Sequence, residues 1–388
     1  MSAAEAPTPV DFLVVGSGIA GASLGYWLAP HGRTLLLERE AQPGYHATGR
    51  SAALFMESYG SAQVRALTMA SRDFLEHPPA GFAEHPLLSP RGAMMVARPG
   101  EQALLDRQWA VLRTVSRHGQ LFDGAAACAL LPVLRREQVL GAVYEPDACD
   151  MDVHAIHQGY LRGMRRAGGE LRCNAEVTAI ERAGERWQVS AAGRSYHARV
   201  LVNAAGAWCD QVAALAGVPA IGLVARRRSA FLFAPPPADG WQRWSMVAGL
   251  DHGWYMKPDA GMLLGSPANE DPVPPQDVQP EELDIAVGAH RIEAMTTLGV
   301  RPIRPWAGLR SFVDDGDLVG GFDPLAPGFF WLAAQGGYGI QTSAAMGEAC
   351  AALVRGAALP RRLADFDIDA ARLGPQRLPR GAAHGSRP

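Results

Sequence analysis

A glycine-rich turn near the N-terminus constrains the fold more than any other feature of the chain. The apolar residues 11–15 (DFLVV) predict a buried strand, which leads directly into the sequence GSGIAG at residues 16–21. A helical pattern follows, and residues 33–37 predict a second buried strand that ends at Glu38. Strand, glycine-rich turn, helix and strand in this order predict a parallel βαβ unit and therefore an α/β fold.

The three glycines of this turn have separate physical roles in binding a dinucleotide. Gly16 permits the tight turn, Gly18 allows a pyrophosphate to approach the backbone, and Gly21 allows the helix to pack closely on the strand. Ile19 and Ala20 open the helix, whose free N–H groups attract phosphate. The alternative is a glycine-rich turn without a ligand, and the complete βαβ context argues against it.

Glu38 and the loop after it favour FAD over a nicotinamide cofactor. Glu38 stands 20 residues after Gly18, where a carboxylate can accept hydrogen bonds from ribose hydroxyls. The loop at residues 42–53 follows at once and holds small residues and hydroxyls with one arginine. In such a loop the chain can run a second time alongside an extended dinucleotide. A nicotinamide-binding fold more often continues into another helix at this point. An ordinary surface loop is the alternative interpretation.

The rest of the chain alternates between segments with an α/β pattern and a segment with a mostly β pattern. Residues 153–167 predict a helix with Asp152 as its N-cap. Between residues 227 and 310 aromatic residues and prolines dominate, which predicts a mostly β domain with long loops. An α/β pattern follows, with a predicted strand at 329–334 and a predicted helix at 340–354.

Composition excludes several classes of partner and site. A net charge of −3 and a pI near 6.4 argue against binding to nucleic acid or to an anionic membrane. We find no apolar run of the roughly 18 residues that an integral membrane segment needs. Residues 1–9 do not resemble a signal peptide, so a cytoplasmic location is expected. The 5 cysteines are widely spaced, which predicts isolated thiols and no metal site. Lys257 is the only lysine, a bias that the codon usage of a bacterium explains.

Several motifs resemble the D-amino acid oxidase superfamily of FAD-dependent oxidoreductases. Besides the glycine turn and Glu38, these motifs are TGRS at residues 48–51, VNAAGAW at 202–208, GLR at 308–310 and GGYG at 336–339. The resemblance extends over nearly the whole chain. Within the superfamily, the sequence is most similar to the bacterial D-arginine dehydrogenases.

The resemblance implies two lobes, with the chain passing between them more than once. A Rossmann-like FAD-binding lobe of α/β class would comprise residues 10–84, 151–222 and 308–373. A mostly β substrate-binding lobe would comprise residues 85–150 and 223–307, so that the protein is α+β overall. Residues 1–9 and 374–388 are expected to be disordered tails.

The resemblance also implies which residues contact FAD. The bond to the cofactor is expected to be non-covalent, because no cysteine lies near Arg310, where sarcosine oxidase relatives attach their flavin. The expected contacts are Gly16, Gly18, Ile19, Ala20, Gly21, Glu38, Arg39, Thr48, Gly49, Arg50, Ser51, Ala52, Val177, Ala205, Gly206, Trp208, Gly336, Gly339 and Ile340.

The same resemblance implies a set of substrate-binding residues. Arg310 matches the arginine that binds the substrate carboxylate, a role that suits the planar fork of a guanidinium. Tyr255 matches a tyrosine that assists it, Tyr59 matches an aromatic residue on a mobile loop over the site, and Arg228 matches a second arginine. A structural role is the alternative for each. Within the run at residues 226–228, only one arginine needs to point inward.

The chain departs from the D-arginine dehydrogenases at three pocket positions. Ala93 stands where those enzymes have a glutamate for the substrate guanidinium, and Leu54 and Met56 stand where they have histidine and threonine. The pocket is therefore expected to be more apolar, with Tyr338 as a further wall. Gly337 frees the backbone at the start of the predicted C-terminal helix, whose N-terminus would stabilise negative charge on a reduced flavin.

The resemblance and these departures imply oxidation of D-amino acids to imino acids, which hydrolyse to 2-oxo acids and ammonia. Apolar or aromatic side chains are expected to be preferred over D-arginine. The nearest alternative is an FAD-dependent oxidase or dehydrogenase of secondary or N-substituted amines. Others are a flavin-binding subunit without turnover and an NAD-dependent dehydrogenase.

The electron acceptor is expected to be a quinone or oxygen. The segment at residues 261–265 lacks the lysine found in sarcosine oxidase relatives, which favours a quinone. No certain general base is predicted, and His46 is expected to make only a structural hydrogen bond.

Overall fold

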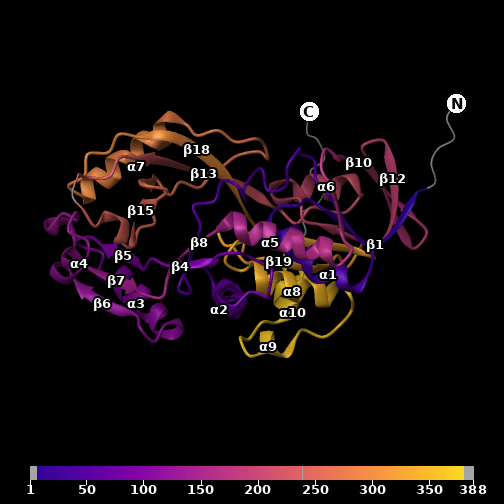
Figure 1. Cartoon of the computed structure of the whole chain (residues 1–388), viewed down its shortest axis with the longest axis horizontal. Coiled ribbons are helices and arrows are strands. Elements are labelled where there is room, and N and C mark those ends of the chain that lie inside the picture. Colours follow the sequence, from indigo (N-terminus) through magenta and orange to yellow (C-terminus); the bar gives the residue numbers. More distant parts are fainter. Residues whose placement is uncertain (1–6, 238, 380–388) are drawn as a thin grey trace.

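The protein has a mixed α/β fold with two lobes, each built on one large β-sheet (Figure 1). The computed structural model describes residues 7–237 and 239–379. The first lobe contains an eight-stranded sheet and the second a nine-stranded sheet. Within the described ranges, no helix is long and apolar enough to cross a membrane.

The first lobe contains the predicted βαβ unit. β1 (Thr8–Val15) and β2 (Thr34–Leu37) are parallel neighbours joined through α1 (Ile19–Leu28). β1 also pairs in parallel with β12 (Arg194–Asn203), and β12 pairs in parallel with β20 (Phe329–Ala333). The other strands of this sheet are β9 (Glu170–Arg172), β10 (Val177–Ala183), β11 (Arg186–Ala191) and β19 (Val319–Phe322).

Alternating apolar residues of β1 supply two separate cores on the two faces of this sheet. Phe12 and Val14 belong to the core that α1 shares with other helices, whereas Leu13 and Val15 belong to the opposite core. The longer helices that contribute to the first core are α2 (Ala62–Glu76), α5 (Val153–Arg166) and α8 (Ser343–Val354), and α6 (Cys209–Leu215) contributes to the second. As predicted, Asp152 caps α5, because its side chain accepts a hydrogen bond of 2.8 Å from the Ala155 amide.

The second lobe consists mainly of the nine-stranded sheet. Its path is β17-β13-β16-β15-β14-β5-β7-β6, and β18 pairs with β13. The strands are β5 (Ala93–Ala97), β6 (Gln120–Asp123), β7 (Gly141–Glu145), β13 (Val224–Phe233), β14 (Met246–Gly249), β15 (Tyr255–Asp259), β16 (Met262–Ser266), β17 (Asp271–Pro272) and β18 (Ile303–Phe312). The helices of this lobe are α3 (Gln102–Val115), α4 (Gly124–Leu130) and α7 (Glu282–Met295).

A small three-stranded sheet lies between the two large ones in Figure 1. It consists of β3 (Leu54–Phe55), β8 (Cys149–Met151) and β4 (Leu88–Pro90). The loop at residues 42–53, called the flavin loop below, leads into β3. This sheet therefore fixes the flavin loop against segments 30 to 100 residues away in sequence. At the C-terminal end, α9 (Arg361–Ala364) and α10 (Ala370–Leu373) follow α8.

The structure differs from the sequence-based boundaries at three points. β18 belongs to the nine-stranded sheet, so the expected domain boundary at residue 308 falls inside a strand. Residues 374–379 are not a disordered tail, because they include the 3₁₀ turn Pro375–Arg377 and the buried Leu378. α8 starts at Ser343, since residues 336–342 form turns. The expected disorder of residues 1–6 and 380–388 lies outside the described residues.

Candidate active site

A cavity opens at the carboxyl ends of β1, β2 and β12, around the glycine-rich turn. This is the position at which doubly wound sheets bind dinucleotides. Twelve of the predicted cofactor contacts line it, namely Gly16, Gly18, Ile19, Ala20, Glu38, Arg39, Thr48, Val177, Ala205, Gly206, Trp208 and Gly336. The predicted contacts Gly21, Gly49, Arg50, Ser51, Ala52, Gly339 and Ile340 are not among its lining residues.

The turn itself needs glycine for reasons of space. Gly16 has φ of +98°, and a β-carbon there would lie 2.5 Å from the Ala204 carbonyl oxygen. A β-carbon at Gly21 would lie 2.0 Å from the Gly16 carbonyl oxygen, so Gly21 allows α1 to pack against the turn, as predicted. Gly18 is the N-cap of α1 and gives it no side-chain cap. The first residues of α1 line the cavity. The Ile19 amide donates a hydrogen bond of 2.9 Å to the Thr48 hydroxyl.

Glu38 is held in place by groups of the same turn. Its carboxylate accepts hydrogen bonds from the Ser17 amide at 3.0 Å and from the Ser17 hydroxyl at 2.7 Å, and the Glu40 amide donates to it at 3.0 Å. On the other side of the turn, the buried His157 ring donates through Nε2 to the Ser17 carbonyl oxygen at 2.8 Å. Sequence reasoning missed His157, because it lies 140 residues from Ser17 and has no motif around it.

Aromatic and charged side chains close the end of the cavity next to Glu38. The Arg39 guanidinium lies 4.5 Å from the centre of the Trp208 ring, and the His46 ring lies 4.7 Å from it. His46 contacts the Glu40 carboxylate at 2.9 Å, and this hydrogen bond is the main cause that holds the pKa of Glu40 below its usual value. His46 also lines the cavity, so its purely structural role stays a prediction.

The Arg50 side chain does not line the cavity, and its role as a cofactor contact stays a prediction. Its Nη1 donates to the carbonyl oxygens of Val278 at 3.0 Å and Ala307 at 3.3 Å, and its Nη2 contacts the Asp277 carboxylate. The Trp306 indole in turn donates to the Arg50 carbonyl oxygen at 3.0 Å. Arg50 therefore fastens the flavin loop to the second lobe.

The predicted substrate arginines lie together on one face of the second sheet. Arg226 pairs with Arg310 across β13 and β18, so Arg228, two residues further on, is a diagonal neighbour of Arg310 on the same face. Arg227 points to the opposite face and pairs with Asp284 at 2.9 Å. Burial is the main cause that lowers the pKa of Arg228, and the nearby charge of Arg310 acts in the same direction.

Arg310 lies between two aromatic residues and the backbone of the C-terminal turn. Its Nη1 donates to the Tyr59 hydroxyl at 3.3 Å, and a β-carbon at Gly337 would lie 2.7 Å from the same nitrogen. The Tyr59 and Tyr338 rings meet edge to face, with centroids 4.9 Å apart. Tyr59 and Tyr255 interact electrostatically with both Arg228 and Arg310. The structure thus brings together the predicted tyrosines, arginines and Gly337.

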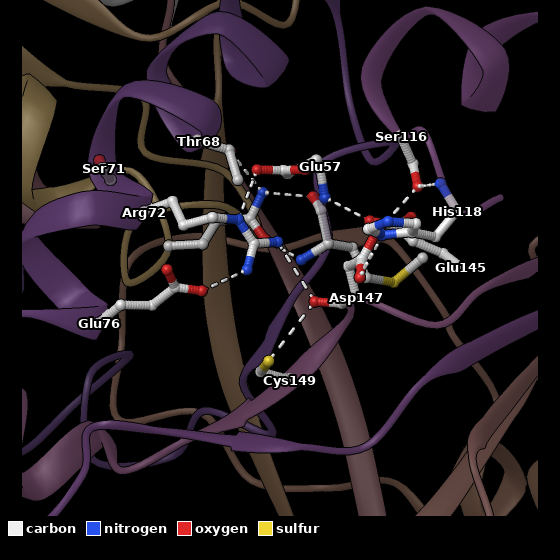
Figure 2. A network of polar contacts seen from close by, with 12 residues as sticks. Glu57, Thr68, Ser71, Arg72, Glu76, Ser116, His118, Glu145, Asp147 and Cys149 are labelled. Atoms are coloured by element: carbon white, nitrogen blue, oxygen red, sulfur yellow. Dashed lines mark hydrogen bonds and ion pairs between the residues drawn. The ribbon is translucent and has the colours of Figure 1, made fainter.

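A buried polar network fixes the segment that carries Tyr59 (Figure 2). The Glu145 carboxylate accepts a hydrogen bond of 2.7 Å from the Glu57 amide and another from the Ser58 hydroxyl. Arg72 joins the same segment from α2, because its Nε donates to Glu57 at 2.7 Å and its Nη2 to the Asp147 carbonyl oxygen at 3.2 Å. Burial is the largest influence on Glu145, and it raises the pKa of this carboxyl.

The pocket positions at which the chain departs from D-arginine dehydrogenases fall in one apolar cluster. Met56 and Ala93 are buried in it, with relative exposures of 5% and 1%. Leu54, Tyr59 and Tyr255 are partly buried and pack against the same cluster. The two tyrosines therefore pack against apolar side chains, and the role of these residues as a substrate pocket stays a prediction.

The lysine, the cysteines and the possible metal ligands of the chain complete the description of its reactive groups. Lys257 is buried beside the flavin loop, 2.8 Å from Asp150 and 3.4 Å from the Ala53 carbonyl oxygen. All five cysteines are free thiols, and Cys209 and Cys350 are buried. Among the described residues, no group of histidine, cysteine and acidic side chains could hold a metal ion.

The family model for DAO, FAD dependent oxidoreductase, matches residues 11–353, which is most of the chain. The chain belongs to the DAO family of FAD-dependent oxidoreductases. FAD is therefore its cofactor, and the observed cavity fits this dinucleotide. It offers the N-terminus of α1 and the glycine-rich turn for the pyrophosphate, the fixed carboxylate of Glu38 for hydroxyls, and apolar side chains such as Val177 and Val212 for rings.

Relatives of this DAO-family chain are distant in sequence and close in fold. FAD-dependent oxidoreductase domain-containing protein 1 of Bos taurus is 24% identical over 412 residues, covering 90% of this chain and 82% of that protein. The crystal structure of glycine oxidase from Geobacillus kaustophilus has a TM-score of 0.83 at 21% identity, covering 97% of this chain and all of that one. L-proline dehydrogenase from P. horikoshii has a TM-score of 0.81 at 18% identity, covering 96% and 98% of the two chains.

Proposed function

We propose that this DAO-family enzyme oxidises the Cα–N bond of D-amino acids that carry apolar or aromatic side chains. The observation that carries the proposal is the contact between Arg310 and Tyr59 beside the apolar cluster of Leu54, Met56 and Ala93. A buried cation next to a hydroxyl suits a carboxylate, and an apolar wall suits an uncharged side chain.

The residues of the chain would bind and orient the substrate. Arg310 and Tyr59 would hold the carboxylate, and Tyr255 would assist them from β15. Gly337 leaves the space that Arg310 occupies. FAD, when bound, accepts the hydride from the substrate Cα, and the amine releases a proton to solvent. The imino acid product then reacts with water to give a 2-oxo acid and ammonia, a step that needs no protein nucleophile.

Two considerations support the choice of substrate. The motifs shared with D-arginine dehydrogenases support the D configuration. Ala93 in place of a glutamate argues against D-arginine itself, because a buried guanidinium without a carboxylate partner is costly. A quinone acceptor and non-covalent FAD, both expected from the sequence, belong to the same proposal.

Secondary or N-substituted amines are the second candidate class of substrate. The structural likeness to L-proline dehydrogenase from P. horikoshii favours this class, as does N-methyl-L-tryptophan oxidase from Citrobacter koseri, which is 23% identical over 266 residues. Neither likeness exceeds 25% identity, so each supports the candidate only through the shared fold.

An anaerobic panel of amines tests both candidates. The purified FAD-loaded enzyme is mixed with D-amino acids, L-amino acids and N-substituted amines, and loss of the oxidised flavin absorbance is recorded. We expect D-leucine and D-phenylalanine to bleach the flavin much faster than D-arginine. Bleaching by N-substituted amines alone would show that the second candidate is correct, and equal rates with D-arginine would contradict the apolar pocket.

A further inference from the structure

Glu270 places a carboxylate of the protein itself between the two arginines of the candidate substrate site. Its Oε1 lies 2.6 Å from Arg228 Nη2 and 3.9 Å from Arg310 Nη1. These are the two guanidinium groups available to a substrate carboxylate. Glu270 thus already partly neutralises the positive charge of both arginines.

The backbone beside Glu270 is fixed, whereas its side chain reaches solvent. The Asn269 side chain accepts a hydrogen bond from the Ser229 amide at 2.8 Å and donates to Asp284 at 2.9 Å. The Asn269 carbonyl oxygen accepts a further bond of 2.7 Å from Arg228 Nε. The Glu270 side chain is 45% exposed, so it can leave the arginines by changing rotamer without moving the backbone of the segment between β16 and β17.

The two arginines differ in how firmly Glu270 holds them. Arg228 is 11% exposed and has both Glu270 and the Asn269 carbonyl oxygen as close partners. Arg310 Nη1 lies 3.3 Å from the Tyr59 hydroxyl and 3.9 Å from Glu270 Oε1, so Glu270 holds Arg310 less firmly than Arg228. A substrate carboxylate that binds Arg310 would still lie near the negative charge of Glu270.

We propose that Glu270 is a specificity residue that competes with the substrate carboxylate for Arg310 and Arg228. The inference rests on the proposed carboxylate site at Arg310. When a carboxylate ligand binds, Glu270 swings toward solvent or remains as a repelling charge, and in both cases the affinity of the site for anions falls. Ligands without a carboxylate do not face this competition. Glu270 thereby weakens the binding of anionic ligands relative to neutral amines of the same shape.

The test uses the FAD-loaded enzyme and benzoate, a carboxylate that has no amine to oxidise. Dissociation constants are measured from the change in the flavin absorption spectrum for the wild type and for Glu270→Gln. We expect the variant to bind benzoate about two- to fivefold more tightly, which corresponds to the loss of one exposed ion pair that competes with the ligand. The matched control is Glu281→Gln, because Glu281 contacts Arg227 on the opposite face of the sheet, and its benzoate affinity should not change.

A kinetic readout separates this inference from the proposed function. With a D-amino acid that bleaches the flavin, Glu270→Gln should lower KM and leave kcat unchanged. Unchanged or weaker benzoate binding in Glu270→Gln would overturn the inference. If neither form binds benzoate, no carboxylate enters the site and the inference is also overturned. The anaerobic amine panel is independent of both results and decides the proposed function separately.

Discussion

The guanidinium of Arg310 lies so close to Gly337 that a β-carbon at residue 337 would come within 2.7 Å of its Nη1. A side chain at residue 337 would therefore push the Arg310 guanidinium out of its present position beside the turn after β20. This contact links the C-terminal turn of the first lobe to the carboxylate-binding group proposed for the second lobe.

The substitution Gly337→Ala should displace Arg310 and weaken substrate binding. Loss of a charge-assisted contact of about 1.5–3 kcal/mol predicts a rise in KM of about ten- to a hundredfold. Steady-state kinetics with the best amine of the panel checks this. Gly299→Ala is the control, because an added β-carbon there meets open space, and it should leave KM unchanged. A KM for Gly337→Ala equal to that of the wild type would argue against carboxylate binding by Arg310.

The substitution Tyr59→Phe should raise KM with a smaller effect on kcat. It removes the hydroxyl that accepts a 3.3 Å hydrogen bond from Arg310, a contact worth about 0.5–1.5 kcal/mol. The expected rise in KM is about two- to tenfold for substrates with a carboxylate. Tyr338→Phe is the control, since it keeps the ring that packs on Tyr59. An equal effect of both substitutions would mean that the Tyr59 hydroxyl has no special role.

The substitution Ala93→Glu should shift the preference toward D-arginine. Ala93 is buried in the apolar cluster that also contacts Tyr59 and Tyr255, so a carboxylate there could pair with a substrate guanidinium. We expect the ratio of kcat/KM for D-arginine over D-leucine to rise by about tenfold or more. Ala93→Gln, of similar size and without charge, should change the ratio far less. The same ratio in both variants would show that charge at residue 93 does not select the substrate.

The substitution Glu38→Ala should weaken FAD binding. The Glu38 carboxylate is held by Ser17 and Glu40 at the edge of the cavity, where it can accept hydrogen bonds from FAD hydroxyls. Loss of such charged hydrogen bonds, at about 1.5–3 kcal/mol, predicts an increase in Kd of ten- to a hundredfold. Titration of the apoprotein by FAD fluorescence measures it. Glu170→Ala, which removes an exposed acid paired with Arg172, should leave the Kd unchanged.

The substitution Glu145→Gln should alter the pH dependence of stability in a defined direction. Burial raises the pKa of Glu145, so the folded protein holds this proton more tightly than the unfolded chain does. The wild type therefore loses free energy of unfolding as pH rises through the ordinary glutamate pKa, near 4.3, toward the raised value. The variant should lack this loss. Denaturant unfolding at several pH values between 4 and 8 compares the two, and parallel curves would contradict the prediction.

Local sequence determined the parts of this protein that depend on neighbouring residues. The βαβ unit, the roles of Gly16 and Gly21 and the capping of α5 by Asp152 were predicted, because strand burial, turn geometry and helix capping act over a few residues. The apolar environment of Met56 was also expected from its chemistry and from the family resemblance.

Only the tertiary structure decided which distant side chains meet. Ser58 and Glu145 are 87 residues apart, and Arg228 and Glu270 are 42 apart, and no motif links either pair. The partners of the Arg50 side chain could not be predicted for the same reason, since they lie more than 200 residues further along the chain. The partners of a charged side chain are the groups that the folded chain brings close to it. The periodicity of the sequence indicates only which segments form helices and strands.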